Sequence, residues 1–235
     1  MKSKLIIFLA VVLFSIAGTT ACSTTESENV KTSGIWARFT VEHHPDGDVV
    51  CWAVLRVGGG TGTVIELSGG EHIRCNDIQM SEYFEPVTNF RWNRAIVPED
   101  LDGIYDFLFV RTDEEINTSI VMPELPFIYE LFPDDVVLEG EALTIYWDDE
   151  YPGDVVDIHV EGSCIENLSA LSVADSGEYT FDEVLLSPDT LETTCDLDIQ
   201  VVRIIEDSVN PAYQGGFIEA HRIDLVTIPF EALSI

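Results

Sequence analysis

The chain has 235 residues, of which 46% are apolar and 23% are charged, and its 43 acidic residues face only 11 Lys and Arg. The apolar fraction suffices for a packed core, which excludes a wholly disordered chain. The net charge of -32 argues against a nucleic-acid partner, because phosphate binding requires basic residues. The acidity indicates either binding of cations or basic partners or adaptation to a salty habitat, and we favour the habitat.

The N-terminus has the pattern of an export signal over residues 1–21. Two lysines precede an unbroken apolar run at residues 5–14, which is too short for a transmembrane helix and typical of a signal peptide. The run leads into Thr-Thr-Ala-Cys at residues 19–22. This motif resembles the lipobox of bacterial lipoproteins, although Thr19 stands where Leu is usual.

The lipobox resemblance implies cleavage before Cys22 and a palmitate-type lipid on the Cys22 thiol. It also implies a lipid-anchored protein, and Ser23 favours delivery to the outer membrane, on its periplasmic or its outer side. The alternative is an ordinary secretory signal followed by a disulfide cysteine. Residues 22–33 are polar and lack apolar periodicity, which predicts a flexible tether.

The remainder of the chain has the pattern of β-structure. Apolar and polar residues alternate over 35–42, 143–147 and 197–201, and Gly, Pro, Asn and Asp separate the runs. No window of helical length carries a convincing apolar stripe. The sequence therefore predicts an all-β protein.

An apparent internal repeat predicts two domains of similar size. The sequence Gly-Asp-Val-Val occurs at residues 47–50 and again at 153–156. Two shorter matches follow the same order and nearly the same offset: residues 39–41 with 143–145, and residues 126–127 with 229–230. We therefore expect tandem immunoglobulin-like or fibronectin-type β-sandwich domains over 34–130 and 131–235.

Each half also carries a motif that resembles the tyrosine corner of immunoglobulin-like domains. The motif is Asp-Ser-Gly-Glu-Tyr at residues 175–179 and, in looser form, Asp-Gly-Ile-Tyr at residues 102–105. The resemblance implies that the hydroxyl groups of Tyr105 and Tyr179 hydrogen-bond to backbone across a corner.

The repeat alignment predicts which side chains of the strand at residues 49–57 face the core. Apolar alternation after the second Gly-Asp-Val-Val transfers to the first copy, and there it places Val50, Trp52 and Val54 inward and Cys51 outward. We therefore expect Trp52 to be a core residue and not a ligand platform. His159 is expected to be a solvated strand histidine.

Four cysteines remain after Cys22, and three pairings of them are possible. An exported chain and the domain boundary favour the disulfides Cys51–Cys75 and Cys164–Cys195. A zinc site built from all four is the less favoured alternative, because no C-x2-C spacing is present. We therefore expect no metal centre at these residues.

Catalytic motifs are not apparent. The glycines at residues 58–62 lack the Lys-Ser/Thr of a phosphate loop and predict a hairpin connection. The loop at residues Asp148–Asp154 holds four carboxylates, which indicates a weak calcium ligand set or a solvated turn. We therefore expect no catalytic residue, no cofactor and no established metal site.

Together these patterns predict a membrane-anchored bacterial lipoprotein that acts as a non-catalytic binding or adhesion module, with a protein or glycan ligand. The alternative is a secreted carbohydrate-active enzyme or its accessory domain. Two carboxyl groups at a fixed separation beside exposed aromatic residues would favour that alternative.

Overall fold

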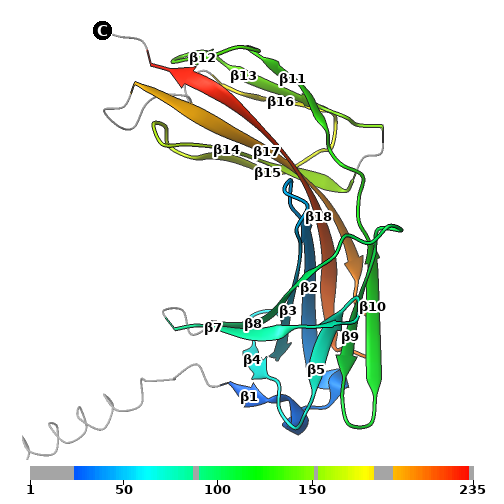
Figure 1. Cartoon of the computed structure of the whole chain (residues 1–235). Helices are drawn as coiled ribbons and strands as arrows, with labels where there is room; N and C mark the ends of the chain where they lie inside the picture. Colours follow the sequence, from blue (N-terminus) through cyan, green and yellow to red (C-terminus); the bar gives the residue numbers. More distant parts are fainter. Residues whose placement is uncertain (1–23, 87–89, 151–152, 183–192, 233–235) are drawn as a thin grey trace, which may run out of the picture.

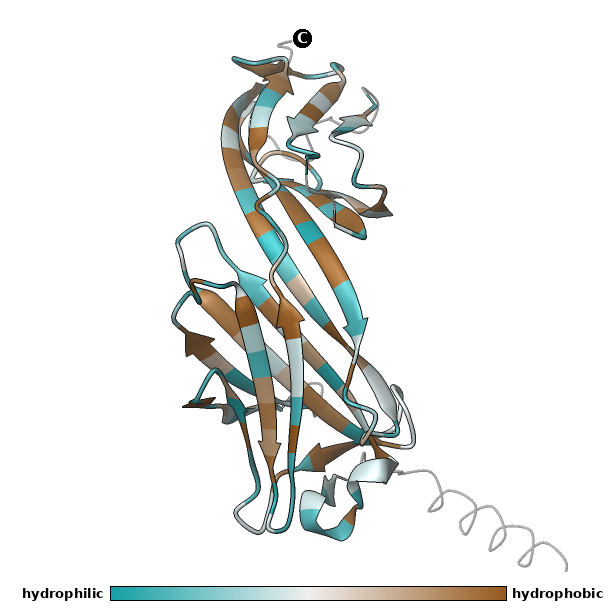
Figure 2. Cartoon of the chain, turned by 90° about the vertical axis from the view of Figure 1, so that its right-hand side faces the viewer, coloured by the Kyte–Doolittle hydropathy of each residue, from teal (hydrophilic) through white to brown (hydrophobic). Residues whose placement is uncertain are grey.

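The computed structural model describes residues 24–86, 90–150, 153–182 and 193–232, and it confirms the all-β class (Figure 1). The only helical turns in these ranges are two short 3-10 turns, at Ser27–Asn29 and Thr32–Gly34. The apolar and polar bands alternate along the strands (Figure 2), as expected for strands with one buried face.

One large sheet runs through the whole molecule in the order β1-β4-β3-β2-β18-β17-β14-β15, with β8 paired to β3, β7 to β8 and β12 to β18. Its strands are β1 (Thr25–Glu26), β2 (Ile35–His43), β3 (Val49–Val57), β4 (Thr63–Glu66), β7 (Ser81–Glu85), β8 (Phe90–Val97), β12 (Val137–Leu138), β14 (Val155–Gly162), β15 (Leu168–Val173), β17 (Thr194–Ser208) and β18 (Gly215–Glu231).

Two smaller sheets pack on this large sheet and complete two sandwiches. The first has the order β10-β9-β5-β6, with β5 (His72–Cys75), β6 (Ile78–Gln79), β9 (Ile104–Val110) and β10 (Glu115–Val121). The second has the order β11-β13-β16, with β11 (Ile128–Phe132), β13 (Leu143–Trp147) and β16 (Glu178–Phe181). Facing β15-β14-β17-β18, this second sheet forms an immunoglobulin-like sandwich.

The β17–β18 hairpin belongs to both sandwiches, which differs from the expected division at residue 131. Its two strands pair without a register shift from Thr194↔Glu231 to Ser208↔Phe217. Its open end contributes Leu197, Ile199, Ile228 and Phe230 to the second core, whereas its closed end contributes Val209, Tyr213, Ile218 and Ala220 to the first. Residues 131–235 therefore do not form a self-contained unit.

Both cores lie on the same side of the large sheet. Ile218 and Ala220 face the first core, Ile228 and Phe230 face the second, and all four are even-numbered residues of the unbroken strand β18. Successive side chains of a strand point to opposite faces, so the two smaller sheets cover one side. No sheet formed by the described residues covers the other side of the large sheet, and Figure 1 shows β9 and β10 on the covered side of β2 and β18.

The predicted repeat is wrong, because the matched segments occupy different places. In the first sandwich β2 pairs with β3 in the large sheet. In the second, β13 lies in the three-stranded sheet, while β14 lies in the large one. Gly47 adopts a left-handed φ of 89°, whereas Gly153 packs against Arg203 without one. Short apolar strands after a glycine turn are common enough to match by chance.

The tether predicted at residues 22–33 is packed onto the first sandwich over its described part. Ser27 is fully buried and Thr32 is 6% exposed. The guanidinium of Arg111 donates to the carbonyl of Ser27 at 2.9 Å and to the hydroxyl of Thr32 at 2.9 Å. A segment without apolar periodicity is thus held by long-range hydrogen bonds that its own sequence does not indicate.

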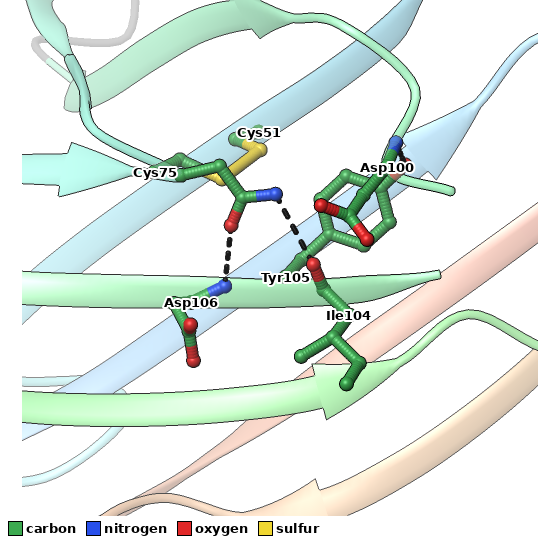
Figure 3. Close-up of a disulfide and its surroundings, with 7 residues drawn as sticks. Cys51, Cys75, Asp100, Ile104, Tyr105 and Asp106 are labelled. Atoms are coloured by element: carbon green, nitrogen blue, oxygen red, sulfur yellow. Dashed lines mark hydrogen bonds between the residues drawn. A yellow bond between two sulfur atoms is a disulfide. The ribbon is translucent and has the colours of Figure 1, made fainter. Parts of the chain in front are cut away.

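The two predicted cysteine pairings are those of the structure. Cys51 and Cys75 have a Cα–Cα distance of 6.6 Å, and Cys164 and Cys195 have one of 5.8 Å. The first bridge joins β3 in the large sheet to β5 in the smaller sheet (Figure 3). Each bridge lies within one core, so neither links the two sandwiches.

The tyrosine corner is present in the first sandwich only. The Tyr105 side chain is 1% exposed, and its hydroxyl accepts a hydrogen bond from the N–H of Asp100 at 3.2 Å (Figure 3). In the second sandwich the prediction is wrong, because the Tyr179 hydroxyl forms no hydrogen bond with any described residue and its ring packs on Phe181 at 5.0 Å. Asp175 instead makes the buried contacts described in the Discussion.

Candidate functional site

The orientation of β3 is the opposite of that predicted. Cys51 is fully buried, because its disulfide to Cys75 in the opposing sheet requires it to point inward. Trp52 and Val54 therefore lie on the open face of the large sheet and are partly exposed. The predicted facing depended on the alignment of residues 47–50 with residues 153–156, and these segments are not structurally equivalent. A shift of one residue in such an alignment exchanges the two faces of a strand.

This reversal places a hollow of about 370 Å³ on the open face of the first sandwich. Four strands of the large sheet supply its walls, and none of these residues was singled out as a ligand contact by the sequence. The lining residues are Arg38, Thr40 and Glu42 from β2, Trp52 and Val54 from β3, Phe90 and Trp92 from β8, and His221 from β18.

Four aromatic side chains form what we call the aromatic cluster: Trp52, Tyr83, Phe90 and Trp92. Trp92 occupies the centre, with ring centroids 6.1 Å from Trp52, 5.5 Å from Phe90 and 6.4 Å from Tyr83. Trp52, Phe90 and Trp92 line the hollow and are partly exposed, whereas Tyr83 lies beside it and is 45% exposed. A contiguous set of large rings that reaches solvent is a feature of interaction surfaces more than of solvated sheet faces.

The two indole N–H groups of the aromatic cluster differ. Trp52 donates to the carboxylate of Glu42 at 3.0 Å. The indole nitrogen of Trp92 is buried and has no hydrogen-bond partner among the described residues. The nitrogen of Trp92 is enclosed by protein, so Trp92 presents its ring and not its N–H to the hollow.

Arginines border the aromatic cluster. The guanidinium of Arg94 lies 5.0 Å from the ring centroid of Trp52, and that of Arg56 lies 5.4 Å from Phe90. Both distances are within the range of cation–π attraction. Arg38 forms an ion pair with Glu219 at 2.9 Å.

Glu219 is held ionised at the edge of the hollow. Burial raises the pKa of its carboxyl, but the imidazole of His221 at 3.7 Å and the guanidinium of Arg38 at 2.9 Å outweigh burial and leave the pKa below its ordinary value. A glycosidase acid requires a raised pKa. Glu219 is therefore suited to holding Arg38 and not to donating a proton.

The acidic loop at residues 148–154 is described except for residues 151–152. In its described part, Asp148 accepts from the N–H of Glu150 at 2.8 Å, and Asp154 accepts from the N–H of Glu206 at 3.0 Å. Nowhere in the described ranges do three or more His, Cys, Asp or Glu side chains gather in a way that could hold a metal ion. Cys22 lies outside the described residues.

The other sequence candidates take structural positions. Residues 58–62 connect β3 to β4, as predicted for a hairpin, with Gly58 and Gly59 at φ of 88° and 92°. His159 lies on β14 and is hydrogen-bonded to Ser169 at 3.0 Å. Among the described residues, no helix is long and apolar enough to cross a membrane.

Four residues at this surface were not predicted as site residues from the sequence: Tyr83, Phe90, Trp92 and Arg94. A signal for three of them was present in the segment Phe-Arg-Trp-Asn-Arg at residues 90–94, where aromatic and basic residues occupy alternate positions of one strand. Alternate positions share a face, so this pattern placed two rings and a guanidinium side by side.

Comparisons with known proteins identify no family. None of the family models matches the chain, and no curated protein matches it. Among solved structures, the chain is similar to the FN1–FN3 domains of chicken CNTN1, with 13% identity, a TM-score of 0.24 and coverage of 86% of this chain and 65% of that one. It is also similar to the titin fragment A168169, with 10% identity, a TM-score of 0.23 and coverage of 85% and 96%.

A third similar structure is the Bacteroides ovatus mixed-linkage glucan utilization locus protein SGBP-B in complex with a mixed-linkage heptasaccharide. Its identity is 8%, its TM-score is 0.24, and the match covers 89% of this chain and 65% of that one. The chain thus spans slightly less than two thirds of the CNTN1 fragment and of SGBP-B. Because these TM-scores are low, the immunoglobulin-like class rests on the strand order described above.

Proposed function

We propose that this protein is a non-catalytic binding module that binds a saccharide chain on the aromatic cluster of its first sandwich. The observation that carries the proposal is the contiguous, partly exposed set of rings around Trp92 on the open face of the large sheet. Aromatic faces pack against the C–H faces of sugar rings, and the polar edge of arginine pairs with hydroxyl groups.

The aromatic cluster offers ring faces, which favours a saccharide. Peptides commonly bind by adding a strand to a free sheet edge. Such an edge lies on the outer side of β7, because β7 pairs only with β8 among the described residues. A ligand seated on the rings themselves lies flat on side chains, which suits the faces of sugar rings.

We further propose that the mature chain is anchored through lipid on Cys22 in the outer membrane of a bacterium. The motif at residues 19–22 supports this, and Cys22 lies two positions before Thr24, where the packed N-terminal segment begins. Wild-type protein expressed in a bacterial host should incorporate labelled palmitate, and Cys22→Ala should not. Persistence of label in Cys22→Ala would contradict the anchor and leave the binding proposal intact.

Binding to a glycan array, followed by calorimetric titration of the best ligand, tests the binding proposal. Trp52→Ala and Trp92→Ala should each weaken binding by about tenfold or more, because each removes a ring face from the hollow. Tyr129→Ala is the matched control, since Tyr129 is 58% exposed on β11 of the second sandwich. Equal affinity of wild type and both tryptophan variants would refute the proposed site.

A further inference from the structure

The arginines of this chain divide into two groups. Each of five contacts a carboxylate within 4.0 Å: Arg38, Arg91, Arg111, Arg203 and Arg222. Arg56, Arg74 and Arg94 form no ion pair with any described residue. Acidic residues outnumber Lys and Arg by 43 to 11, so carboxylate partners are abundant. Two of the three unpaired arginines nevertheless border the aromatic cluster.

Arg94 is held in position by stacking and not by an acid. It lies directly across the strand pair from Trp52, and its guanidinium is 5.0 Å from the Trp52 ring centroid. Its Nε is buried and has no hydrogen-bond partner among the described residues. Stacking occupies the face of the guanidinium and the Nε side is enclosed, so the terminal edge formed by Nη1 and Nη2 is the part left for bidentate pairing with a carboxylate.

Arg56 provides a second cation beside the same rings. Its guanidinium is 5.4 Å from the Phe90 centroid, and its one hydrogen bond among the described residues goes to the carbonyl of Gly62 at 3.5 Å. The carboxylates nearest the hollow are already engaged, Glu42 by the indole of Trp52 and Glu219 by Arg38. Neither one forms an ion pair with Arg94 or Arg56.

We infer that the ligand is an acidic glycan, and that a uronic acid carboxylate of this glycan pairs with Arg94 while its ring packs on the aromatic cluster. This inference rests on the proposed saccharide-binding function and deepens it. Arg56 is the second contact for the charged chain. A neutral glycan would leave both guanidinium edges without an anionic partner.

The net charge of -32 opposes this ligand mainly at long range, and Glu42, which lines the hollow, opposes it locally. The screening length is about 8 Å at physiological ionic strength, so distant carboxylates act weakly on a bound ligand. The pair with Arg94 is a direct contact, and stacking over Trp52 reduces its exposure to water. Local pairing therefore decides which glycan binds, while the overall charge slows the approach of any anion.

The test compares uronic acid oligosaccharides with their methyl esters, which keep the rings and remove the charge. The full-length mature protein should bind an acidic oligosaccharide at least about tenfold more tightly than its ester. Arg94→Gln should remove that preference, and Arg94→Lys should restore part of it, because lysine keeps the charge without the fork. Raising NaCl should weaken binding of the acid but not of the ester.

Arg74→Gln is the matched control, because Arg74 is also without an ion pair among the described residues. It alternates with buried Ile73 and Cys75 and so lies on the solvent side of the other sheet. Its removal should change neither affinity nor the preference for the acid. Equal binding of acid and ester, or an unchanged preference in Arg94→Gln, overturns the inference while the saccharide function stands. Binding of no glycan at all overturns both.

Discussion

Replacing Arg203 with Met tests the buried ion pair that lies where β17 passes from the second core toward the first. The side chains of Arg203 and Asp175 are each 1% exposed, and Arg203 Nε lies 2.6 Å from Asp175 Oδ2. Asp175 also accepts from the indole of Trp147 at 2.7 Å and from the N–H of Gly153 at 2.6 Å. Arg203 additionally donates to the backbone carbonyl of Glu124 at 3.2 Å.

The cost of Arg203→Met follows from what remains after the change. The Met side chain fills most of the volume of the aliphatic part of Arg203, so the main loss is electrostatic. The variant retains the buried carboxylate of Asp175 without its cation. Removal of one partner of a buried pair costs about 3–5 kcal/mol. Urea unfolding followed by circular dichroism at about pH 7 should show a loss of this size.

The pKa of Asp175 determines how the stabilisation by this ion pair depends on pH. Burial raises the pKa of Asp175, but the hydrogen bonds from Arg203, Trp147 and Gly153 outweigh burial and hold the pKa below its ordinary value. The pair therefore stabilises the fold fully above the unfolded pKa of about 3.9, and this stabilisation is lost as the pH falls through the lower folded pKa.

In Arg203→Met the carboxylate is buried without its cation, so the pKa of Asp175 should rise and its protonation should relieve the cost. The difference in unfolding free energy between wild type and Arg203→Met should consequently shrink between about pH 7 and about pH 3. The double variant Asp175→Asn/Arg203→Met is the control, since it removes the charge and should lose less at neutral pH. A loss below about 1 kcal/mol at neutral pH, or one that does not change with pH, would refute the reasoning.

Three further measurements address the shared sheet, the disulfides and the acidic loop. Gly216→Ala should lower the unfolding free energy by more than about 2 kcal/mol, because Gly216 has a φ of 126° and an added Cβ would lie 1.7 Å from the carbonyl oxygen of Ala37. An unchanged urea midpoint would contradict the parallel pairing of β18 with β2. The double variant Cys51→Ala/Cys75→Ala should lose about 3 kcal/mol by the chain-entropy model, and nonreducing peptide mapping of the wild type should find the two cysteines joined. Thermal unfolding in NaCl, MgCl2 and CaCl2 at matched ionic strength should shift equally, by screening of the acidic surface; an extra shift in CaCl2 would indicate a calcium site in residues 148–154.

Some features of this protein follow from short stretches of its sequence. Apolar alternation predicted β-structure, because a strand with one buried face requires it whatever its partners are. The two disulfides were predictable, since pairing within a domain is favoured when few cysteines are available. The tyrosine corner at Tyr105 was also predictable, because the hydrogen bond spans only five positions of the chain.

Other features depend on contacts between distant segments. Alternation shows that β3 has two faces, but only its disulfide to β5 and its position under the smaller sheet decide that Cys51 points inward and Trp52 outward. Burial alternates near the two ends of the β17–β18 hairpin, and nothing in that local pattern shows that the ends enter different cores. The aromatic cluster combines β3, β7 and β8, so it exists only once their register is set. Local periodicity specifies that a residue is buried or exposed relative to its neighbours in the chain, whereas the choice between the two faces is made by the partner that covers one of them.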